Sequence, residues 1–353
     1  MNAVPADIRE LRLDAIRREA KEKGVVEAPG VRPAGAPMPI ASPQTGYYGA
    51  PLLKEPQWTP LIPLYFFVGG AAGSLGVIGA LADVVGDDKD VALTSRWMAL
   101  GGAVLSGGLL VVDLGRPSRF LNMLRVFKPQ SPMSVGSWVI AGFSASAGMA
   151  SFADLLQRLG APGAITGLVG GIGRVGSAVL GMPLHNYTGV LIGSTVIPVW
   201  NTHRRALPRE FGMSGLQSAV SLLELSGFEN RTSLNLLGLL STGAETIEFG
   251  KAMTDRKPGT EPIRRGVSGA LVQTAAVLSG PLPLALRVAS MFVGKRRNRS
   301  LRIAAACSGV LGSLCLRYGW VKAGTASARD WRLPLQIARD ESVATSRAMQ
   351  KPA

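Results

Sequence analysis

Two tyrosines stand near the start of long apolar segments, Tyr65 in PLYFFVGG and Tyr187 in NYTGVLIG. A quinone needs an apolar slot for its tail and one or two hydrogen-bond donors for its carbonyl oxygens, and a phenol can supply such a donor. Tyrosines at a membrane boundary are also common as simple anchors. For either residue taken alone, the sequence favours the anchor role.

A basic, proline-punctuated segment follows the second long apolar run, DLGRPSRFLNMLRVFKPQSPMSVGSW at residues 113–138. Asp113 falls where the preceding helix is expected to end, because Arg116 follows it and Pro117 cannot continue the helix. An Asp113–Arg116 pair would brace the loop or hydrogen-bond the polar head of a ligand. The sequence leaves both roles open.

Ionisable residues at membrane depth are costly and are therefore candidates for function. Glu224, Glu245, Glu248 and Arg287 fall inside apolar segments, and the spacing of Glu245 and Glu248 places them on one helix face. We expect Arg287 to pair with one of the glutamates. A satisfied ion pair and a proton path are both open readings. Asp83 and Asp154, by contrast, are interpreted as boundary charges near the ends of apolar segments.

Only two histidines are available as haem ligands, His185 and His203. Residues 184–203 are expected to form a single helix, on which the two histidines would lie about 27 Å apart. They could not both coordinate one haem iron. No haem is therefore expected. His185 is open to a boundary role or to a quinone or proton role. Cys307 and Cys315 lie in an apolar run and read as small core residues rather than as cluster ligands.

The composition indicates a membrane protein, with 47% hydrophobic and 17% charged residues and 44 glycines among 353 residues. The net charge of +15 comes mostly from cations between apolar runs and at the termini, which is typical of topology-setting charges. Nucleic-acid binding is therefore disfavoured. No separate signal peptide is recognisable, and the first apolar run is already long enough to anchor the chain.

The apolar runs predict an all-α integral membrane protein with eight transmembrane helices in two four-helix bundles. The expected spans are 61–85, 92–114, 136–159, 184–203, 211–228, 232–253, 267–293 and 300–319. Segment 163–182 carries Arg174 and seven glycines, and we expect it to be re-entrant or interfacial, with a ninth span as the alternative. Glycines at helical spacing in the first two spans indicate close helix packing.

Eight spans put both termini on one side of the membrane, together with the loops after spans 2, 4 and 6. These loops are basic, so the positive-inside rule predicts cytoplasmic termini, although KRRNRSLR after span 7 breaks the pattern. The expected division is a soluble tail at 1–57, a first bundle at 58–205, a second bundle at 206–320 and a soluble tail at 321–353. Within the first tail we expect a short helix at 5–24, a proline-rich linker and a partner contact at 47–58.

Three segments resemble the NrfD/PsrC family, the membrane subunits of polysulfide-reductase-type complexes. They are WTPLIPLYFFVGGAAG (58–73), the segment at 113–138, and NYTGVLIGSTVIPVW (186–200). PLLKEPQW before the first span is similar to the type that accompanies formate-dehydrogenase-like proteins.

The resemblance implies two haem-free four-helix bundles and a quinone site in the first of them, near the membrane surface. It places the first-span contact near Tyr65 and the fourth-span contact near Tyr187, and it matches the loop motif at Asp113 and Arg116. In polysulfide reductase the first-span position is a histidine, where this chain has Pro63-Leu64-Tyr65. The implied partners are a ferredoxin-like iron–sulfur subunit and a molybdenum or tungsten oxidoreductase subunit.

Three functions follow as hypotheses. The first is a quinone-interacting membrane subunit of a multi-subunit oxidoreductase, using menaquinone or ubiquinone in a bacterial inner membrane and completing no catalysis alone. The second is a proton-coupled secondary transporter that uses the buried glutamates, which two helix halves and broken helices would permit. The third is a structural membrane anchor without quinone chemistry.

Overall fold

A computed structural model of the chain describes residues 52–85, 88–114, 117–255, 257–337 and 339, together with Ala15, Arg18, Glu19 and Glu22, which are helical. The expected proline-rich linker, most of the 5–24 helix and Arg116 lie outside the described residues. The elements in chain order are α2 (Leu61–Val85), α3 (Lys89–Asp113), η1 (Pro117–Leu124), α4 (Pro132–Arg158), α5 (Gly163–Gly193), α6 (Pro198–Thr202), α7 (Leu207–Leu223), η2 (Glu224–Phe228), α8 (Thr232–Thr254), η3 (Pro258–Ile263), α9 (Gly266–Ser279), α10 (Pro281–Ser290) and α11 (Lys295–Arg329).

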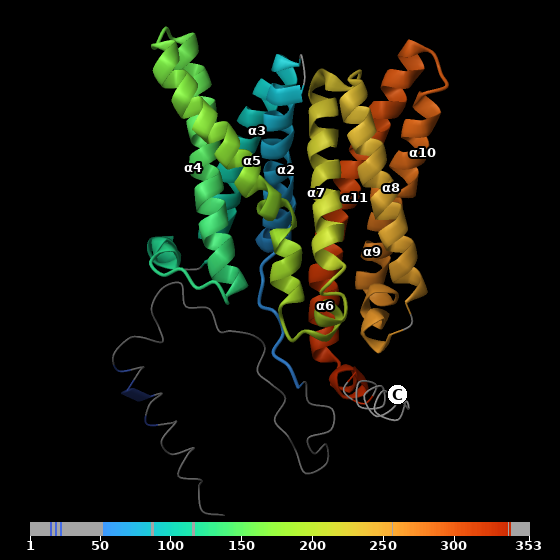
Figure 1. The fold of residues 1–353 in the computed structure, drawn as a ribbon. Helices are drawn as coiled ribbons and strands as arrows, with labels where there is room; N and C mark the ends of the chain where they lie inside the picture. The colour runs from blue at the N-terminus through green and yellow to red at the C-terminus, as the bar shows by residue number, and fades with distance from the viewer. Residues whose placement is uncertain are drawn as a thin grey trace, which may run out of the picture.

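The long helices stand side by side and run up and down in turn (Figure 1). Helices α2, α3, α4 and α5 contact one another and form what we term the first helix group. Helices α7 to α11 form the second helix group, in which α11 packs against α7, α9 and α10. The two groups meet where α7 packs on α2 and α5. Among the described residues the secondary structure is helical, which confirms the expected all-α class.

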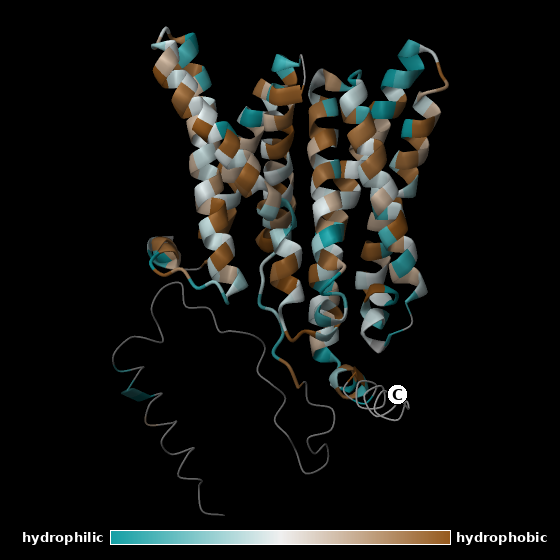
Figure 2. Ribbon diagram, viewed as in Figure 1, coloured by the Kyte–Doolittle hydropathy of each residue, from teal (hydrophilic) through white to brown (hydrophobic). Residues whose placement is uncertain are grey.

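Six segments are long and apolar enough to cross a membrane: α2, α3, α4, α5, the α9–α10 pair and α11. Hydrophobic residues run along the helices and hydrophilic ones gather toward their ends (Figure 2). Helix α2 lies at the centre, since 72% of its apolar window is buried against 28% for α3. The outer faces of α3, α4 and α5 expose large apolar side chains such as Val104, Phe152 and Val175. The chain is therefore a multi-pass membrane protein.

Segment 163–182 is not a separate re-entrant element, and the expected fourth span at 184–203 is wrong. Residues 163–182 and 184–193 belong to α5, a continuous helix of 31 residues that includes Pro183 and ends at Gly193, whereas residues 198–202 form the separate short helix α6. The charge of Arg174 does not prevent crossing, because its guanidinium lies 3.6 Å from Asp154 and 3.7 Å from Asp83. A proline is also tolerated inside membrane helices when neighbouring helices cover the freed carbonyl.

The interpretation of Asp83 and Asp154 as simple boundary charges is wrong. Arg96 of α3 is buried, and its guanidinium lies 2.6 Å from each of the two carboxylates. With Arg174 they form a cluster of two cations and two anions that joins all four helices of the first group. The charges balance within the cluster, which lowers the cost of placing them between helices.

The expected count of eight spans is not confirmed. Helix α7 has 17 residues, and α8 carries Glu245, Glu248 and Lys251, so neither is among the six membrane-length apolar segments. Helix α7 is an interior helix that contacts α2, α5, α8 and α11. Its polar side chains bond to these neighbours, for example Ser214 to Ser313 of α11 at 2.5 Å. These polar side chains lower the hydropathy of α7.

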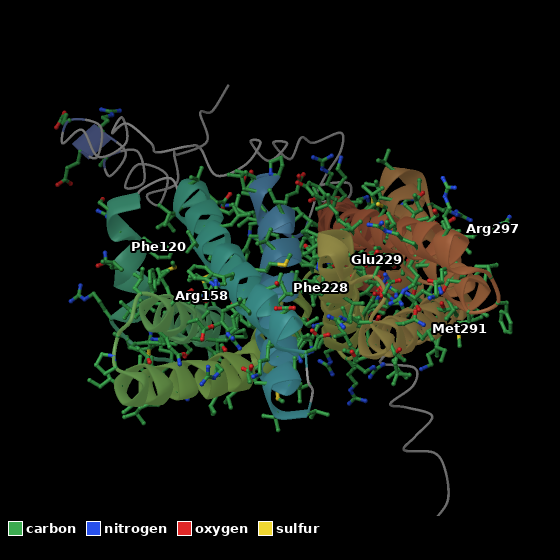
Figure 3. All side chains as sticks on the ribbon, turned by 90° about the horizontal axis from the view of Figure 1, so that it is seen from above. Phe120, Arg158, Phe228, Glu229, Met291 and Arg297 are labelled. Atoms are coloured by element: carbon green, nitrogen blue, oxygen red, sulfur yellow. The ribbon has the colours of Figure 1, made fainter. Side chains whose placement is uncertain are left out.

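The connections alternate between two ends of the molecule. Residues before α2, the η1 segment, α6, η3 and the residues after α11 all lie at one end (Figure 1). Seen along the helices, Phe120 of η1 lies at the first group's outer edge, far from Met291 at the end of α10 and Arg297 in the first turn of α11 (Figure 3). This grouping agrees with the predicted set of basic loops. Which side of the membrane this end faces stays a prediction.

The glycines of the first two spans do not all pack against helices as expected. A Cβ on Gly73 would lie 2.8 Å from the Gly181 carbonyl of α5, so that glycine permits close helix approach. A Cβ on Gly101, Gly107 or Gly108 would meet nothing within 4 Å. The expectation for the cysteines also fails in part, because Cys307 is exposed and only Cys315 is half-buried.

Candidate functional site

An apolar cavity of about 340 Å³ lies inside the first helix group, at the end that carries η1. Helices α2, α3, α4 and α5 supply its walls, and η1 and the residue Trp58 close it below. The lining residues are Trp58, Ile62, Tyr65, Phe66, Gly107, Leu110, Asp113, Leu114, Phe120, Met123, Leu124, Met133, Gly136, Ser137, Ile140, Ala141, Ser144, Tyr187 and Leu191. The volume is within the range of small-molecule sites in proteins.

Tyr65 of α2 and Tyr187 of α5 both line this cavity, so the fold brings the two predicted tyrosines together. Both side chains are almost fully buried. Tyr187 fits only because α4 has a glycine opposite it, since a Cβ on Gly136 would overlap the phenol carbon and oxygen. Two phenols that are buried in one cavity do not serve as anchors at the membrane boundary. The anchor reading is therefore disfavoured for both.

Neither phenol oxygen has a hydrogen-bond partner in the part of the chain that the structure describes. A hydroxyl that faces an apolar cavity is costly unless water or a ligand pairs with it, and native proteins pair most such groups. The neighbouring hydroxyls of the cavity are already used, because Ser137 donates to the Met133 carbonyl at 3.0 Å and Ser144 to the Ile140 carbonyl at 2.7 Å. The two phenols are thus free to donate to a molecule in the cavity.

Asp113 is the charged residue of the cavity wall and lies at the end of α3. Its carboxylate accepts a hydrogen bond from the hydroxyl of Thr59, two residues before α2. The same hydroxyl accepts from the backbone N–H of Leu61 at 3.3 Å, so Thr59 ties the start of α2 to the end of α3. Asp113 is therefore braced by Thr59. The expected partner Arg116 lies outside the described residues.

The η1 segment forms the mouth of the cavity. Phe120, Met123 and Leu124 line the cavity, whereas Leu121 on the other side of the segment is 70% exposed. Beyond η1, the ring of Phe127 packs edge-on against Trp138 of α4. The segment is amphipathic, with Arg119 and Asn122 among its apolar residues, and such a segment at the end of membrane helices is suited to the boundary between lipid and water.

A stack of tryptophans connects the cavity with the second helix group. Trp58 lines the cavity and stacks on Trp200 of α6, with ring centroids 5.2 Å apart. The indole N–H of Trp200 donates to the carbonyl of Trp320 in α11 at 2.8 Å. A Cβ on Gly324 would overlap the Trp200 ring, so α11 is shaped to receive it. The floor of the cavity is therefore fixed to the C-terminal helix.

His185 does not line the cavity, although it is only two residues from Tyr187. Two helical residues are separated by a rotation of roughly 200°, so the two side chains face opposite ways. The His185 ring lies against α7, where a Cβ on Gly212 would be 3.0 Å from its Nε2. His203 is not on the same helix, as had been expected, but caps α6 and is buried beside Trp320. Burial lowers the pKa of His203 below its usual value.

The predicted pairing of Arg287 with a glutamate is confirmed. Arg287 Nη1 and Nη2 donate to the two carboxylate oxygens of Glu224, each at 2.7 Å, and Arg302 adds a third bond at 2.8 Å. All three side chains are buried. Paired in this way, Glu224 reads as a structural ion pair that joins η2, α10 and α11.

Glu245 and Glu248 share a helix but differ in their surroundings. Glu248 lies near the end of α8, 3.2 Å from Arg209 and 2.9 Å from Lys251. Glu245 is buried one turn earlier, with no hydrogen-bond partner for either carboxylate oxygen among the described residues. Of the four proton-path candidates, Glu245 is thus the one that is not held in an ion pair.

Several residues of the site were not singled out from the sequence. Gly136 looks like one more packing glycine, Thr59 like an ordinary cap, and Gly107 like part of a helix contact. Their importance depends on which residues face them in the fold. Trp58 and Met123 lie within predicted segments, but only the structure shows that they line the cavity.

The fold and the cavity together define a class of protein, namely a multi-pass helical membrane protein with an apolar cavity that opens near one end of its helices. A scan against family models matches the family described as polysulphide reductase, NrfD, over residues 54–232, just over half of the chain. The chain therefore belongs to the NrfD family, which confirms the predicted resemblance. The comparison with curated proteins gave no match.

The family consists of membrane subunits of quinone-linked oxidoreductases, which generally assemble with iron–sulfur and molybdoenzyme subunits. The matched range contains every residue that lines the cavity and ends at the start of α8. Among the described residues, no group of three or more His, Cys, Asp or Glu side chains is placed to hold a metal ion. The predicted absence of haem stays a prediction.

Proposed function

We propose that the cavity binds the ring of a membrane quinone between Tyr65 and Tyr187. The observation that supports this most directly is the pair of buried phenols without hydrogen-bond partners in an otherwise apolar cavity. The cavity fits the ligand class, because a quinone is an apolar molecule with two carbonyl acceptors. When bound, a quinone would supply two-electron, two-proton redox chemistry.

The residues of the chain would then hold and orient the ring. Tyr65 and Tyr187 donate hydrogen bonds to its carbonyl oxygens, while Phe66, Ile140 and Leu191 exclude water from the cavity. Asp113, fixed by Thr59, holds a carboxylate at the cavity wall, where it can accept a proton. His185 and Arg116 stay candidates for proton transfer and loop bracing, and His185 would act from the α7 side.

The chain would serve as one subunit of a larger oxidoreductase. We propose that a ferredoxin-like iron–sulfur subunit docks at the end that carries η1 and α6, because the cavity lies nearest to that end. A molybdenum or tungsten subunit, of the formate-dehydrogenase-like type, would lie beyond it. Electrons would pass between the iron–sulfur subunit and menaquinone or ubiquinone. The chain would thus carry out half of a redox reaction and complete none alone.

We further propose that α7 with η2, and α8, cross the membrane together with the six apolar segments. This gives eight crossings in two four-helix bundles, with divisions near residues 58, 206 and 321. It places both termini in the cytoplasm of a bacterial cell with the protein in its inner membrane. The basic residues at the η1 end support that orientation.

Replacing one phenol tests the quinone site. In the assembled complex, Tyr187→Phe removes one donor without changing the shape of the cavity. Because one such hydrogen bond contributes about 0.5–1.5 kcal/mol, we expect quinone turnover to fall by up to about tenfold. The matched control is Tyr318→Phe, since the Tyr318 hydroxyl donates to the Pro60 carbonyl at 2.8 Å outside the cavity.

Equal turnover in both variants would remove Tyr187 from the site and favour a structural anchor. The transporter hypothesis makes a different prediction, because a transporter would act in membranes that contain this chain without redox partners. Proton-coupled solute uptake by the isolated chain in vesicles would support it. Co-purification with an iron–sulfur subunit and loss of turnover in Tyr187→Phe would exclude it.

A further inference from the structure

Three charged side chains lie in the second helix group, away from the tyrosine cavity. Glu210 comes from the first turn of α7, Glu245 from α8 and Arg317 from α11. Arg317 is fully buried and Glu245 is 5% exposed. Glu210 lies beside Arg317, because Glu210 accepts from the indole of Trp320, one turn after Arg317, and Arg317 donates to the carbonyl of Phe211, the residue after Glu210. We refer to Glu210, Glu245 and Arg317 as the acid–arginine cluster.

The members of the cluster are unequally satisfied. Arg317 donates from Nη2 to the Phe211 carbonyl at 2.9 Å, but its Nε and Nη1 have no hydrogen-bond partner among the described residues. Glu210 accepts from the indole N–H of Trp320 at 3.3 Å. Both carboxylate oxygens of Glu245 are buried and have no hydrogen-bond partner among the described residues. Glu245 is thus the least stabilised of the three groups as an anion.

Other charges near the cluster do not balance it. Glu248, one turn after Glu245, is paired with Arg209 and Lys251 and therefore uses the two cations at that end of α8. Helix α9 contributes no charged residue. The acid–arginine cluster therefore has one cation and two carboxyl groups. With both carboxyls ionised, the buried carboxylate of Glu245 would add a net negative charge between helices, which is strongly unfavourable.

We propose that the acid–arginine cluster is a proton-binding site, in which the Glu245 carboxyl holds one exchangeable proton at neutral pH. The proton makes the cluster neutral, with ionised Glu210 beside the Arg317 cation. Glu245 is the group that takes it, because it is buried and lacks the hydrogen-bond donor that Trp320 gives to Glu210. This goes beyond the ion pair of Glu224, whose two arginines leave no negative charge to neutralise.

The cluster lies next to the aromatic wall of the cavity. The Arg317 guanidinium carbon stands 4.1 Å from the centroid of the Phe211 ring, which lies 6.4 Å from the ring of Phe66 in the cavity wall. If the cavity binds a quinone, as proposed above, a change of charge there acts on the bound proton through Arg317. The presence of the proton itself does not depend on that function.

Infrared spectroscopy of the purified protein in lipid vesicles tests the proposal without any quinone. A protonated carboxyl gives a carbonyl stretch that is distinct from that of a carboxylate and shifts in heavy water. At neutral pH we expect this band in the native chain and in the control Glu261→Gln, which removes an exposed glutamate paired with Arg265. We expect the band to be lost in Glu245→Gln.

The charge count makes two further predictions that a purely structural role would not. Glu210→Gln also removes the band, because a single remaining carboxyl stays ionised beside Arg317. Arg317→Met strengthens the band, because both carboxyls then take a proton. Absence of the band in the native chain, or its persistence in both glutamine variants, would overturn the proposal. A band that disappears on addition of sodium ions would do so as well, because the site would then hold a metal cation.

Discussion

Selected glycines leave space beside a helix in both groups, but that space stays open in the first group and is filled by side chains in the second. In the first group, Gly107 faces open space and lines the cavity, where a Cβ would meet nothing within 4 Å. In the second group, the place of a Cβ on Gly238 is filled by the guanidinium of Arg287, and that on Gly309 by the amide of Gln217. The first group thus keeps a space for a ligand, whereas the second fills its interior with polar side chains.

The two helix groups also differ in where their charged side chains lie and in how deeply these are buried. The four charges of the first group lie at the opposite end of α2 from Tyr65, and Asp83 retains 27% side-chain exposure. In the second group, Glu224 and Arg287 are completely buried. The first group therefore keeps its four-residue ionic cluster away from its binding cavity, whose wall carries Asp113. The second group places them in the helix interior, where they fix the packing and hold the proposed proton.

The largest expected effect concerns stability and compares these two ionic clusters. Glu224→Gln leaves Arg287 and Arg302 buried without a counter-charge, so we expect a loss of about 3–5 kcal/mol. Asp83→Asn leaves Arg96 paired with Asp154 in a less buried place, so about 1–2 kcal/mol is expected. Denaturant unfolding of the purified chain measures both values. Equal losses would show that burial does not distinguish the two clusters.

An intermediate effect is expected where the cavity is shaped. Gly136→Ala pushes the Tyr187 phenol from its place, so quinone turnover should fall more than tenfold, with a stability cost of about 1–3 kcal/mol from overpacking. Gly148→Ala on the same helix is the control, because its Cβ meets nothing within 4 Å. Turnover in the assembled complex and unfolding of the chain measure the two effects. Similar turnover in both variants would separate Tyr187 from the reaction.

The smallest effect is expected at the brace between α2 and α3. Thr59→Val keeps the shape of the side chain but removes the hydrogen bond to Asp113, which costs about 0.5–1.5 kcal/mol. Quinone turnover should fall a few-fold, because Asp113 loses its fixed position. The control is Thr254→Val, whose hydroxyl bonds only to carbonyls of its own exposed helix end. A turnover loss in the control alone would exclude the brace.

Much of the first group could be predicted from the sequence, because its signals are local. Tyr65 and Tyr187 stand in long apolar runs, Asp113 precedes a proline, and the three predicted residues do line one cavity. The role of Gly136 could not be predicted, because it depends on a tyrosine about fifty positions away in the chain. The same holds for Arg174, whose partners Asp83 and Asp154 come from other helices.

The second group was harder to predict, because its interior is polar. Helices α7 and α8 have low hydropathy since Ser214, Gln217 and Ser241 bond to neighbouring helices rather than face lipid. The pairing of Arg287 with a glutamate was predicted from the cost of an unpaired charge. The identity of the glutamate that pairs with Arg287 depends on the position of η2 in the fold. The role of Arg317 could not be predicted, because its neighbours in the sequence give no indication of it.

The most direct test of the account is the affinity of the assembled complex for a quinone-site inhibitor when the cavity is filled. Gly107→Leu adds a side chain at the cavity wall, where a Cβ meets nothing within 4 Å, and Gly101→Leu places the same side chain on the exposed face of α3. Titration of each variant with the inhibitor gives the dissociation constant. The account predicts at least a tenfold weaker affinity for Gly107→Leu and native affinity for Gly101→Leu. Native affinity in both variants would contradict it.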